Sequence, residues 1–444
     1  MTRGILSGIL APSRHDRSNK AELLAWQTNQ LRTTIADAYS NVRFWHDLLK
    51  EAGLKPDDIQ SIGDLQKLPL VSKRDLTSRP LRERLSREPE KCIRITTSGT
   101  TGPPMAVYYS KEYVALTALY LHSHFRRWFG LKRVYKSVQL TYTSSSAHFA
   151  ESRPTHNNRK GVGMKAAFFT RPIIERFAAN LYFQNNFGEL IPRLQKFAPD
   201  LIMGRANYLA LLAQSVSREG SVVNPRCVIA TGEPFDEPTR KHVQTALDCP
   251  AYQMYGSNET GPLALECKQR NGLHVFEDRV LLEIVDGSGN PVGPGEQGEI
   301  VVTELTNRAM PLIRYRMQDI GRASIRECAC GVTLPMLDSV EGREIDLIHT
   351  LDGKTVSPKK VLTLMNEIEG LPKCQLVQQT PAFFTLRIFL QRKERMPISP
   401  VEQFLGILKM EIGSDPEIVL QPEVFGEVSA KVRPVISESP RITA

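Results

Sequence analysis

Long apolar runs are missing from this 444-residue sequence, and none approaches the roughly 18 residues that a membrane-spanning helix needs. The first residues, Met1–Asp16, hold an apolar stretch that is too short, and too polar afterwards, for a signal peptide. Cysteine is sparse: seven residues, an odd number, are spread along the chain, which argues against a disulfide framework and for a reducing compartment. We therefore expect a cytoplasmic protein with no membrane partner.

Blocks of like charge are missing as well. The 57 lysines and arginines exceed the 48 acidic residues, but they form no long basic block and do not alternate with aromatic residues. A mild excess of this kind fits a solvated surface, or one that attracts phosphorylated small molecules, better than a nucleic-acid interface. Hydrophobic residues make up 41% of the chain, which excludes a disordered protein, and the length predicts two or three domains.

The apolar spacing predicts helices over residues 20–60 and 111–130. Between residues 172 and 260, short apolar runs alternate with helical patterns. The predicted strands are Asp200–Met203, Val228–Thr231 and Ala251–Tyr255, and the predicted helices are Ile173–Leu181, Leu190–Phe197, Tyr208–Arg218 and Pro238–Ala246. This alternation predicts a doubly wound parallel sheet.

From residue 275 the pattern changes to strands separated by tight turns. Short strands are predicted at Val280–Val285, Gly298–Glu304 and Leu312–Tyr315, which indicates an antiparallel, barrel-like insert. After Gly342 a fresh β/α pattern begins. We therefore expect an α/β protein with a large N-terminal domain, residues 1–341, and a small C-terminal α/β domain, residues 342–444.

The first chemical motif is the segment Thr96–Pro104, TTSGTTGPP, which lies between strands predicted at Lys91–Ile95 and Met105–Tyr109. Glycines let backbone N–H groups converge on an anion, and hydroxyl groups add further donors around it. The segment lacks the Gly-Lys-Ser/Thr of a nucleotide-binding P-loop, and a strand follows it rather than a helix. A threonine-rich surface turn is the alternative interpretation.

Two further motifs carry carboxylates. Tyr255–Gly261, YGSNETG, follows a predicted parallel strand, where α/β sheets bind ligands, and its Glu259 could hold Mg²⁺ beside a triphosphate. Arg314–Arg322, RYRMQDIGR, contains Asp319, which could accept two hydrogen bonds from ribose hydroxyls. Taken singly, Glu259 is equally compatible with an ordinary charged loop, and an ordinary turn aspartate is the better interpretation of Asp319.

Cys267, His274, Cys328 and Cys330 have the number and kind of ligands that a closed tetrahedral zinc site needs. Their spacing differs from that of a zinc finger, since Cys-x-Cys is tighter than the usual Cys-x₂-Cys. Buried thiols beside a surface histidine are the alternative.

Together, the three motifs and their spacing resemble the adenylate-forming superfamily and, within it, the phenylacetate–CoA ligase branch. The resemblance extends from about residue 25 to about residue 435, and three further segments agree with it: Leu68–Leu76, Thr231–Pro234 and Glu341–Asp346. It implies a two-step reaction. A carboxylic acid, expected to be aromatic, attacks the α-phosphorus of ATP to give an acyl-adenylate and pyrophosphate, and the thiol of coenzyme A then displaces AMP.

The resemblance also implies roles for residues at matching positions. The phosphate-binding residues are Thr97, Ser98, Gly99, Thr100, Thr101 and Gly102. The residues that flank adenine are Gly232, Glu233, Pro234, Tyr255 and Gly256. Asp319 is implied to bind ribose. The resemblance also implies three catalytic residues: Glu259 holds Mg²⁺, Arg343 lies near the nucleotide at the hinge, and Lys431 drives adenylation. Some members of the branch carry zinc at positions matching the cysteines and histidine above, which implies a structural Zn²⁺ pinning the insert to the sheet.

The sequence departs from the family pattern at several positions. Pro103-Pro104 stand where many members carry a lysine, Asn258 replaces a threonine, and Met317-Gln318 replace Thr-Gly. Lys431 lies one place off the usual spacing, and Thr141–Phe149 replaces the usual acyl-pocket segment. The identity of the acid therefore stays open.

Two alternatives to a coenzyme A ligase also stay open. The acceptor of the acyl group could be an amine or another small nucleophile, which would make the protein an amide ligase or a specialised biosynthetic enzyme. A catalytically inactive nucleotide-binding relative is the second alternative. We expect small-molecule partners and a monomer or homodimer.

Overall fold

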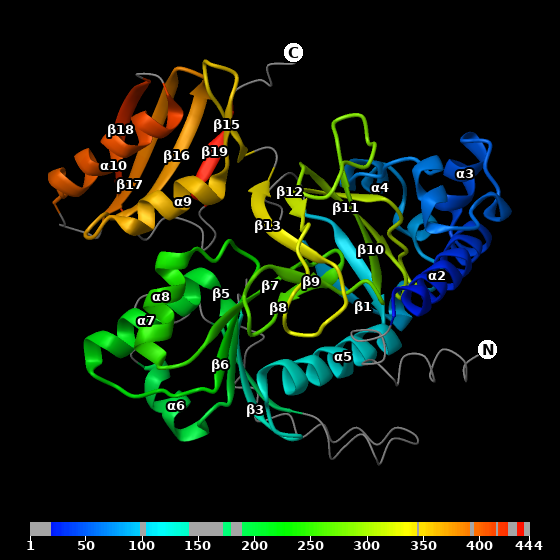
Figure 1. Cartoon of the computed structure of the whole chain (residues 1–444), viewed down its shortest axis with the longest axis horizontal. Coiled ribbons are helices and arrows are strands. Elements are labelled where there is room, and N and C mark those ends of the chain that lie inside the picture. The colour runs from blue at the N-terminus through cyan, green and yellow to red at the C-terminus, as the bar shows by residue number, and fades with distance from the viewer. Residues whose placement is uncertain are drawn as a thin grey trace.

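The computed structural model describes residues 19–97, 104–141, 172–178, 189–343, 346–390, 395–413, 416–424 and 433–438. Figure 1 shows a large N-terminal body built around one long sheet, and a smaller C-terminal unit that lies beside α8 and β13. Among the described residues, no helix is long and apolar enough to cross a membrane.

The helices follow the predicted pattern in most of the chain. They are α2 (Lys20–Asn41), α3 (Arg43–Glu51), α4 (Lys73–Thr77), α5 (Lys111–Phe129), α6 (Leu190–Phe197), α7 (Ala206–Glu219), α8 (Glu237–Leu247), α9 (Pro358–Glu367) and α10 (Ile398–Ile412). Short 3-10 helices are η2 (Pro56–Asp58), η3 (Ile62–Lys67), η4 (Leu81–Arg84) and η5 (Pro89–Lys91).

The ends of these helices have local causes. The Ser110 side chain accepts a hydrogen bond from the Tyr113 N–H at the start of α5, and Gly130 ends the helix in the left-handed region at φ 72°. At α8 the cap is Asp236, and a proline occupies the first turn, as the sequence predicts.

Most of the strands belong to one eleven-stranded sheet with the order β10-β11-β12-β13-β9-β8-β7-β6-β5-β3-β4. Its strands are β3 (Lys136–Thr141), β4 (Ile173–Ala178), β5 (Leu201–Arg205), β6 (Cys227–Thr231), β7 (Ala251–Ser257), β8 (Gly261–Glu266), β9 (Leu273–Val275), β10 (Val280–Val285), β11 (Gln297–Glu304), β12 (Tyr315–Ala323) and β13 (Met336–Arg343). A separate hairpin joins β1 (Cys92–Thr96) to β2 (Ala106–Ser110).

The sheet has a parallel half and an antiparallel half. Strands β4, β3, β5, β6 and β7 pair in parallel, whereas β7 pairs with β8 in the antiparallel sense. The doubly wound parallel sheet and the antiparallel strands that the sequence predicts are therefore both present. The antiparallel strands continue the same hydrogen-bonded sheet.

Two of the predicted elements are wrong. Residues from Ile173 form strand β4 rather than a helix, because they pair in parallel with β3, from Lys136↔Ile173 to Thr141↔Ala178. The strand predicted at Leu312–Tyr315 begins only at Tyr315. Leu312 is buried in the loop that precedes this strand, and its carbonyl accepts a hydrogen bond from the Glu304 N–H of β11.

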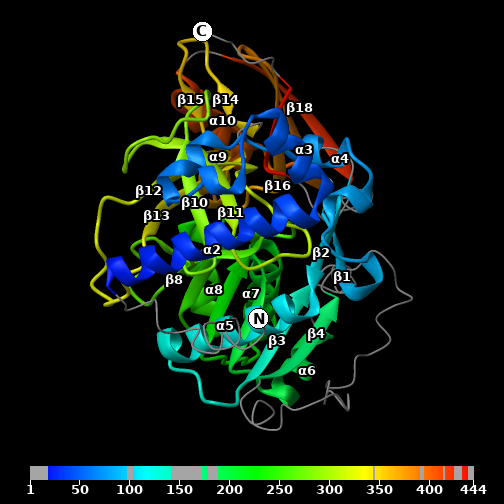
Figure 2. The same cartoon turned by 90° about the vertical axis from the view of Figure 1, so that its right-hand side faces the viewer.

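Separate hydrophobic clusters fill the two halves of the large body. Helix α2 packs Leu31 and Ile35 against β10 and β11, and Figure 2 shows this helix crossing the antiparallel half of the sheet. Helices α6, α7 and α8 pack against the parallel strands through a second cluster.

The C-terminal unit has a core of its own, formed by residues between Ile348 and Val435. Its strands are β14 (Ile348–His349), β15 (Thr355–Val356), β16 (Lys373–Thr380), β17 (Phe383–Leu390), β18 (Glu417–Val424) and β19 (Val435–Ser437). The unit meets the large body at α8, where the Asn366 amide donates to Asp236 Oδ2 at 2.8 Å and to Thr239 Oγ1 at 3.1 Å.

Candidate active site

The candidate site begins at the carboxyl ends of the parallel strands, where such sheets bind ligands. Strands β6 and β7 pair in parallel up to Thr231 and Met254, so Gly232 leaves the sheet at the edge where Tyr255 lies, and Tyr255 itself continues in β7 as the partner of Ala264 in β8. Gly232 has a φ of 72°, which permits the turn after β6. Glu233 faces the start of α7, where its Oε2 accepts the Asn207 N–H at 3.3 Å.

Tyr255, Asp319 and Arg343 come together from three strands. The Tyr255 hydroxyl donates to Asp319 Oδ2 at 2.8 Å, and Arg343 Nε lies 4.0 Å from Asp319 Oδ1. Asp319 and Arg343 are direct cross-strand partners in the β12–β13 ladder. Burial and the adjacent Asp319 carboxylate raise the pKa of Tyr255 well above its usual value, so the phenol stays neutral and keeps donating.

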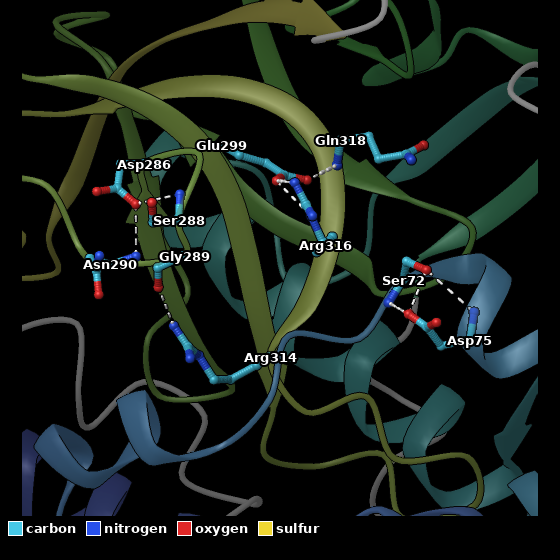
Figure 3. Close-up of polar contacts among 10 residues, drawn as sticks. All are labelled: Ser72, Asp75, Asp286, Ser288, Gly289, Asn290, Glu299, Arg314, Arg316 and Gln318. Carbon is cyan, nitrogen blue, oxygen red and sulfur yellow. Dashed lines mark hydrogen bonds and ion pairs between the residues drawn. The ribbon is translucent and has the colours of Figure 1, made fainter. Parts of the chain in front are cut away.

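A strained bend in β12 presents Asp319. Gln318, its neighbour, has a φ of 59°, which non-glycine residues rarely adopt. Glu299 on β11 stabilises this bend: its Oε1 accepts the Gln318 N–H at 3.1 Å and its Oε2 accepts Arg316 Nε at 2.8 Å. Figure 3 shows Glu299 between these two residues.

The loop that carries Glu259 is tied to the β1–β2 hairpin. The Asn258 carbonyl accepts the Tyr109 hydroxyl at 2.7 Å, and the Asn258 amide donates to the Thr96 carbonyl at 3.1 Å. Asn258, which replaces the usual threonine of the family, thus links the Glu259 loop to the start of the TTSGTTG motif. Gly256 precedes this loop, and a Cβ there would meet the Gly261 carbonyl oxygen at 2.3 Å, so only glycine fits.

Of the predicted phosphate loop, Thr97 is described, and Ser98–Gly102 lie outside the described residues. Thr97 is buried, and its Oγ1 accepts the Met105 N–H at 2.9 Å, which closes the base of the loop. Lys73 Nζ donates to the same Thr97 Oγ1 at 3.2 Å. Sequence reasoning missed a role for Lys73, although it lies within the family-like segment Leu68–Leu76.

Lys73, Glu259, Asp319 and Arg343, which we call the nucleotide cluster, share one electrostatic environment. Burial lowers the pKa of Lys73, Glu259 raises it and Arg343 lowers it, so these three charges lie close enough to interact. The pKa of Tyr315 is raised by burial, by Glu259 and by Asp319. Two carboxylates and two cations therefore lie near one another at the carboxyl edge of the sheet, and one of the cations, Lys73, is bonded to Thr97.

Lys431 and the predicted acyl-pocket segment after Thr141 lie outside the described residues. Two residues beyond Lys431, Arg433 Nη1 lies 2.6 Å from Asp346 Oδ1, and the Arg433 carbonyl accepts the Gln375 amide at 2.7 Å. Arg433 is thereby attached to Asp346, which closely follows Arg343 in the sequence.

Four residues gather at the end of the β12–β13 hairpin that is remote from Asp319 and Arg343. They are Cys267, His274, Cys328 and Cys330, which we call the thiol cluster. Their potential ligand atoms all lie within 4.8 Å of one another. Cys267 Sγ is 3.6 Å from Cys328 Sγ, and Cys330 Sγ is 3.3 Å from His274 Nε2. Two sulfurs bound to one tetrahedral zinc at about 2.3 Å lie about 3.8 Å apart, so these separations fit a zinc ion.

The surroundings of the thiol cluster also suit a structural metal. His274 Nδ1 lies 3.1 Å from the Leu334 carbonyl oxygen, which favours the Nδ1–H tautomer, and Nε2 faces Cys330 Sγ, where a metal ligand is needed. His274 is fully buried and stacks edge-on against Trp128, with ring centroids 5.5 Å apart. The Val332 N–H donates to Cys330 Sγ at 3.4 Å. Burial raises the pKa of the Cys330 thiol, and this contact opposes that effect.

The fold and the nucleotide cluster define a nucleotide-binding enzyme of the adenylate-forming class. The chain belongs to the AMP-binding enzyme family, whose model matches residues 24–306. This finding and the relatives below confirm the resemblance read from the motifs.

Known relatives and structures agree with this assignment. The chain is 28% identical to the phenylacetate-coenzyme A ligase of Thermus thermophilus over 81% of its length and 78% of the relative. It is 29% identical to the Escherichia coli phenylacetate-coenzyme A ligase over 80% of its length and 79% of the relative. The fold resembles a 2-hydroxyisobutyryl-CoA ligase in complex with R3-HIB-AMP, with a TM-score of 0.76, 18% identity and coverage of 96% of this chain and 93% of that one.

Proposed function

We propose that this enzyme is an AMP-forming acid–CoA ligase. It activates a carboxylic acid, expected to be aromatic, with ATP to give an acyl-adenylate and pyrophosphate, and then transfers the acyl group to coenzyme A. The observation that carries the proposal is the nucleotide cluster, in which Asp319 and Arg343 are paired across strands beside Tyr255. Similarity to phenylacetate-coenzyme A ligases over four fifths of the chain supports the choice of acid and acceptor.

Asp319 is the proposed ribose ligand. Its Oδ2 already accepts the Tyr255 hydroxyl, so the carboxylate is oriented before any ligand arrives, and a carboxylate can accept hydrogen bonds from two ribose hydroxyls. The Tyr255 ring and the turn Gly232–Pro234 then offer a surface for adenine between β6 and β7. Arg343 balances the charge of Asp319 and adds a cation near the phosphates.

Glu259 is the proposed Mg²⁺ ligand. Its loop is tied through Asn258 to Thr96, next to the phosphate loop Thr97–Gly102, so a metal on Glu259 would adjoin the phosphates. When bound, Mg²⁺ would neutralise charge on the triphosphate; the protein contributes the carboxylate and the hydroxyl donors. Excess Mg²⁺ should therefore partly rescue Glu259→Ala.

Residues 342–444 are proposed to move as a domain between the two half-reactions, with Lys431 acting in the first. The separate core of this unit and the φ of 109° at Gly342, just before Arg343, support a hinge there. Adenylation needs a cation beside the α-phosphate, and a lysine near the C-terminus reaches that position only when the small unit closes over the large one.

The thiol cluster is proposed to hold one structural Zn²⁺. Three sulfurs and one imidazole nitrogen complete a tetrahedral site and leave no position for substrate, so the metal would link β8, β9 and the β12–β13 connection without taking part in the reaction. All seven cysteines are free, which fits a cytoplasmic protein.

A screen of carboxylic acids for acid-dependent pyrophosphate release tests the function. Release should require ATP, Mg²⁺ and one class of acid, and coenzyme A should then accelerate AMP formation. Parallel reactions with amines in place of coenzyme A identify the acceptor. ATP binding without pyrophosphate release for any acid would favour an inactive nucleotide-binding relative.

A further inference from the structure

Two tyrosine hydroxyls hold the peptide groups on either side of Glu259. Tyr109, on β2, donates to the Asn258 carbonyl at 2.7 Å. Tyr113, in the first turn of α5, donates to the Thr260 carbonyl at 3.1 Å. The residue that bears the carboxylate therefore lies between two anchored carbonyl groups, and its backbone has little freedom to move.

The two tyrosines form one buried unit. Their rings are stacked, with centroids 4.9 Å apart and an angle of 8° between the ring planes, and both side chains are buried. The chain after Glu259 approaches this unit closely, because a Cβ on Gly261 would lie 3.1 Å from the Tyr113 hydroxyl oxygen. A displacement of either ring would thus disturb the other ring and the loop together.

A buried ion pair anchors Tyr113 from behind. The Arg279 guanidinium lies 5.1 Å from the centre of the Tyr113 ring, and Arg279 Nη2 donates to Thr117 Oγ1 at 2.7 Å. The Tyr113 proton is shared between the Thr260 carbonyl and Glu304 Oε2, which lies 3.3 Å from the hydroxyl. Burial and the Glu304 carboxylate raise the pKa of Tyr113, so the phenol stays neutral and keeps its proton.

The contacts of Glu259 itself run through its backbone. The Glu259 N–H donates to Ser257 Oγ at 3.1 Å, whereas no group in the described part of the chain donates a hydrogen bond to the Glu259 carboxylate. A ligand residue whose backbone is already fixed loses less conformational entropy when it binds. The loop therefore combines a fixed main chain with a carboxylate that is available to a cation.

We propose that Tyr109 and Tyr113 are positioning residues that hold Glu259 where it binds the Mg²⁺ of Mg–ATP. The inference rests on the proposed ATP-dependent function and deepens it. The two hydroxyls act through the peptide groups next to Glu259, as residues behind a metal ligand commonly do. Phenylalanine at either position would keep the stacked ring but release one carbonyl, so the Glu259 carboxylate would spend less time in its binding position.

Calorimetric titration with ATP, in Mg²⁺ and without added Mg²⁺, tests this role without knowledge of the acid. The ratio of the two affinities measures what the metal contributes. Tyr109→Phe and Tyr113→Phe should each lower this ratio about three- to tenfold, as expected for the loss of one hydrogen bond. The affinities for AMP and for metal-free ATP should stay within about twofold of wild type. Tyr109→Phe carries the test if Tyr113→Phe does not fold.

A double-mutant cycle shows whether the effect passes through Glu259. Glu259→Ala should lower the ratio by itself, and adding Tyr109→Phe or Tyr113→Phe should then lower it no further. A purely structural role would persist in the Glu259→Ala background.

Two other tyrosines provide matched controls. Tyr108 is buried on the same strand as Tyr109, and its hydroxyl makes no hydrogen bond to any described residue, so Tyr108→Phe should behave as wild type. Tyr120 lies on α5, and its hydroxyl donates to Asp278 Oδ1 at 2.6 Å. Tyr120→Phe should lower the melting temperature and leave the ratio unchanged, which separates positioning of Glu259 from general support of the fold.

An unchanged ratio in Tyr109→Phe and Tyr113→Phe, or an equal loss of ATP affinity with and without Mg²⁺, would overturn the proposal. A further loss in the Glu259→Ala background would do the same. A wild-type ratio in Glu259→Ala would overturn Glu259 as the Mg²⁺ ligand and this role with it. Wild-type protein that binds no ATP would instead overturn the proposed function itself.

Discussion

The thiol cluster and the nucleotide cluster occupy opposite ends of one pair of strands. At one end of β12 and β13, Asp319 and Arg343 are cross-strand partners; at the other, Met336 pairs with His274, and Cys328 and Cys330 lie in the connection. The thiol cluster is compact, with Cys267 and His274 buried and Cys328 and Cys330 half-buried. The nucleotide cluster is charged, partly exposed and built on strained backbone at Gln318.

This difference shows how one hairpin can serve structure and chemistry at once. A closed ligand set at one end can fix the register of the strands, and the register then sets the position of Asp319 opposite Arg343. Changes in the thiol cluster should therefore alter stability, whereas changes in the nucleotide cluster should alter binding and rate. The experiments below test that separation, from the largest expected effect to the smallest.

Cys328→Ser should remove the structural metal. We expect wild-type protein to contain about one zinc per chain by elemental analysis and the variant to contain much less. The free energy of unfolding should fall by several kcal/mol, since structural zinc binding is worth roughly 10 kcal/mol or more in small zinc peptides and less in a prefolded domain. ATP affinity of the folded fraction, measured at low temperature, should change little.

Cys92→Ser is the control for that variant, because Cys92 is a half-buried thiol outside the cluster. It should keep its zinc and most of its stability. Absence of zinc in wild-type protein prepared without a chelator would contradict a metal in the thiol cluster.

Asp319→Ala should change binding and leave stability nearly unaltered. Loss of two charge-assisted hydrogen bonds to ribose, roughly 1.5–3 kcal/mol each, should weaken ATP and AMP alike, since both contain ribose. Calorimetric titration measures both affinities. Asp338→Ala, at the other end of the same hairpin, removes a carboxylate paired with Arg326 and serves as the control. Wild-type ATP affinity in Asp319→Ala would contradict the ribose assignment.

Lys431→Ala should separate the two half-reactions. We expect acid-dependent pyrophosphate formation to fall about a hundredfold or more, equivalent to about 2.7 kcal/mol, because the lysine stabilises charge that grows as pyrophosphate leaves. ATP affinity, and thioester formation from a preformed acyl-adenylate, should be much less affected. Lys409→Ala on α10 is the control. An equal loss in both half-reactions, or none in either, would assign the work to another group, with Lys354 and Lys359 as the next candidates.

Asn366→Ala should have the smallest effect, because it removes only the contact between α9 and α8. The lost hydrogen bonds to Asp236 and Thr239 contribute about 1 kcal/mol to the observed arrangement, so local opening there should increase about fivefold. Hydrogen exchange should rise at the start of α8 and along α9 and stay unchanged in β16 and β17. Uniform faster exchange across the C-terminal unit would instead indicate general destabilisation.

The sequence predicts the parallel sheet and most helices because their patterns are local. Apolar runs such as Val228–Thr231 and the proline at the start of α8 are visible without knowing any partner. Strand β4 escapes this reasoning because Ile173, Ile174 and Phe177 also fit one face of a helix, and its partner β3 is far away in the sequence. Pairing across that distance overrides the local pattern.

The candidate site likewise contains residues that the sequence alone predicts and residues whose role depends on distant contacts. Cysteine and histidine are rare and chemically specific, so the sequence alone predicts the members of the thiol cluster, and the structure brings all four together. Glu259, Asp319 and Arg343 were expected from the family resemblance. Lys73 was not, because its position depends on the bridge between Val71 and Tyr315. The contacts of Tyr109 with Asn258 and of Glu299 with Gln318 could not be predicted from the sequence either, because they join segments that are distant in the chain.

The most direct test of the central claim is to follow oxygen from the acid. A substrate carboxylate labelled with ¹⁸O is incubated with ATP, Mg²⁺, coenzyme A and the enzyme, and the nucleotide and pyrophosphate are analysed by mass spectrometry. If the carboxylate attacks the α-phosphorus and the thiol then attacks the acyl carbon, one ¹⁸O should appear in AMP and none in pyrophosphate. AMP formed without label, or label in pyrophosphate, would contradict an acyl-adenylate intermediate.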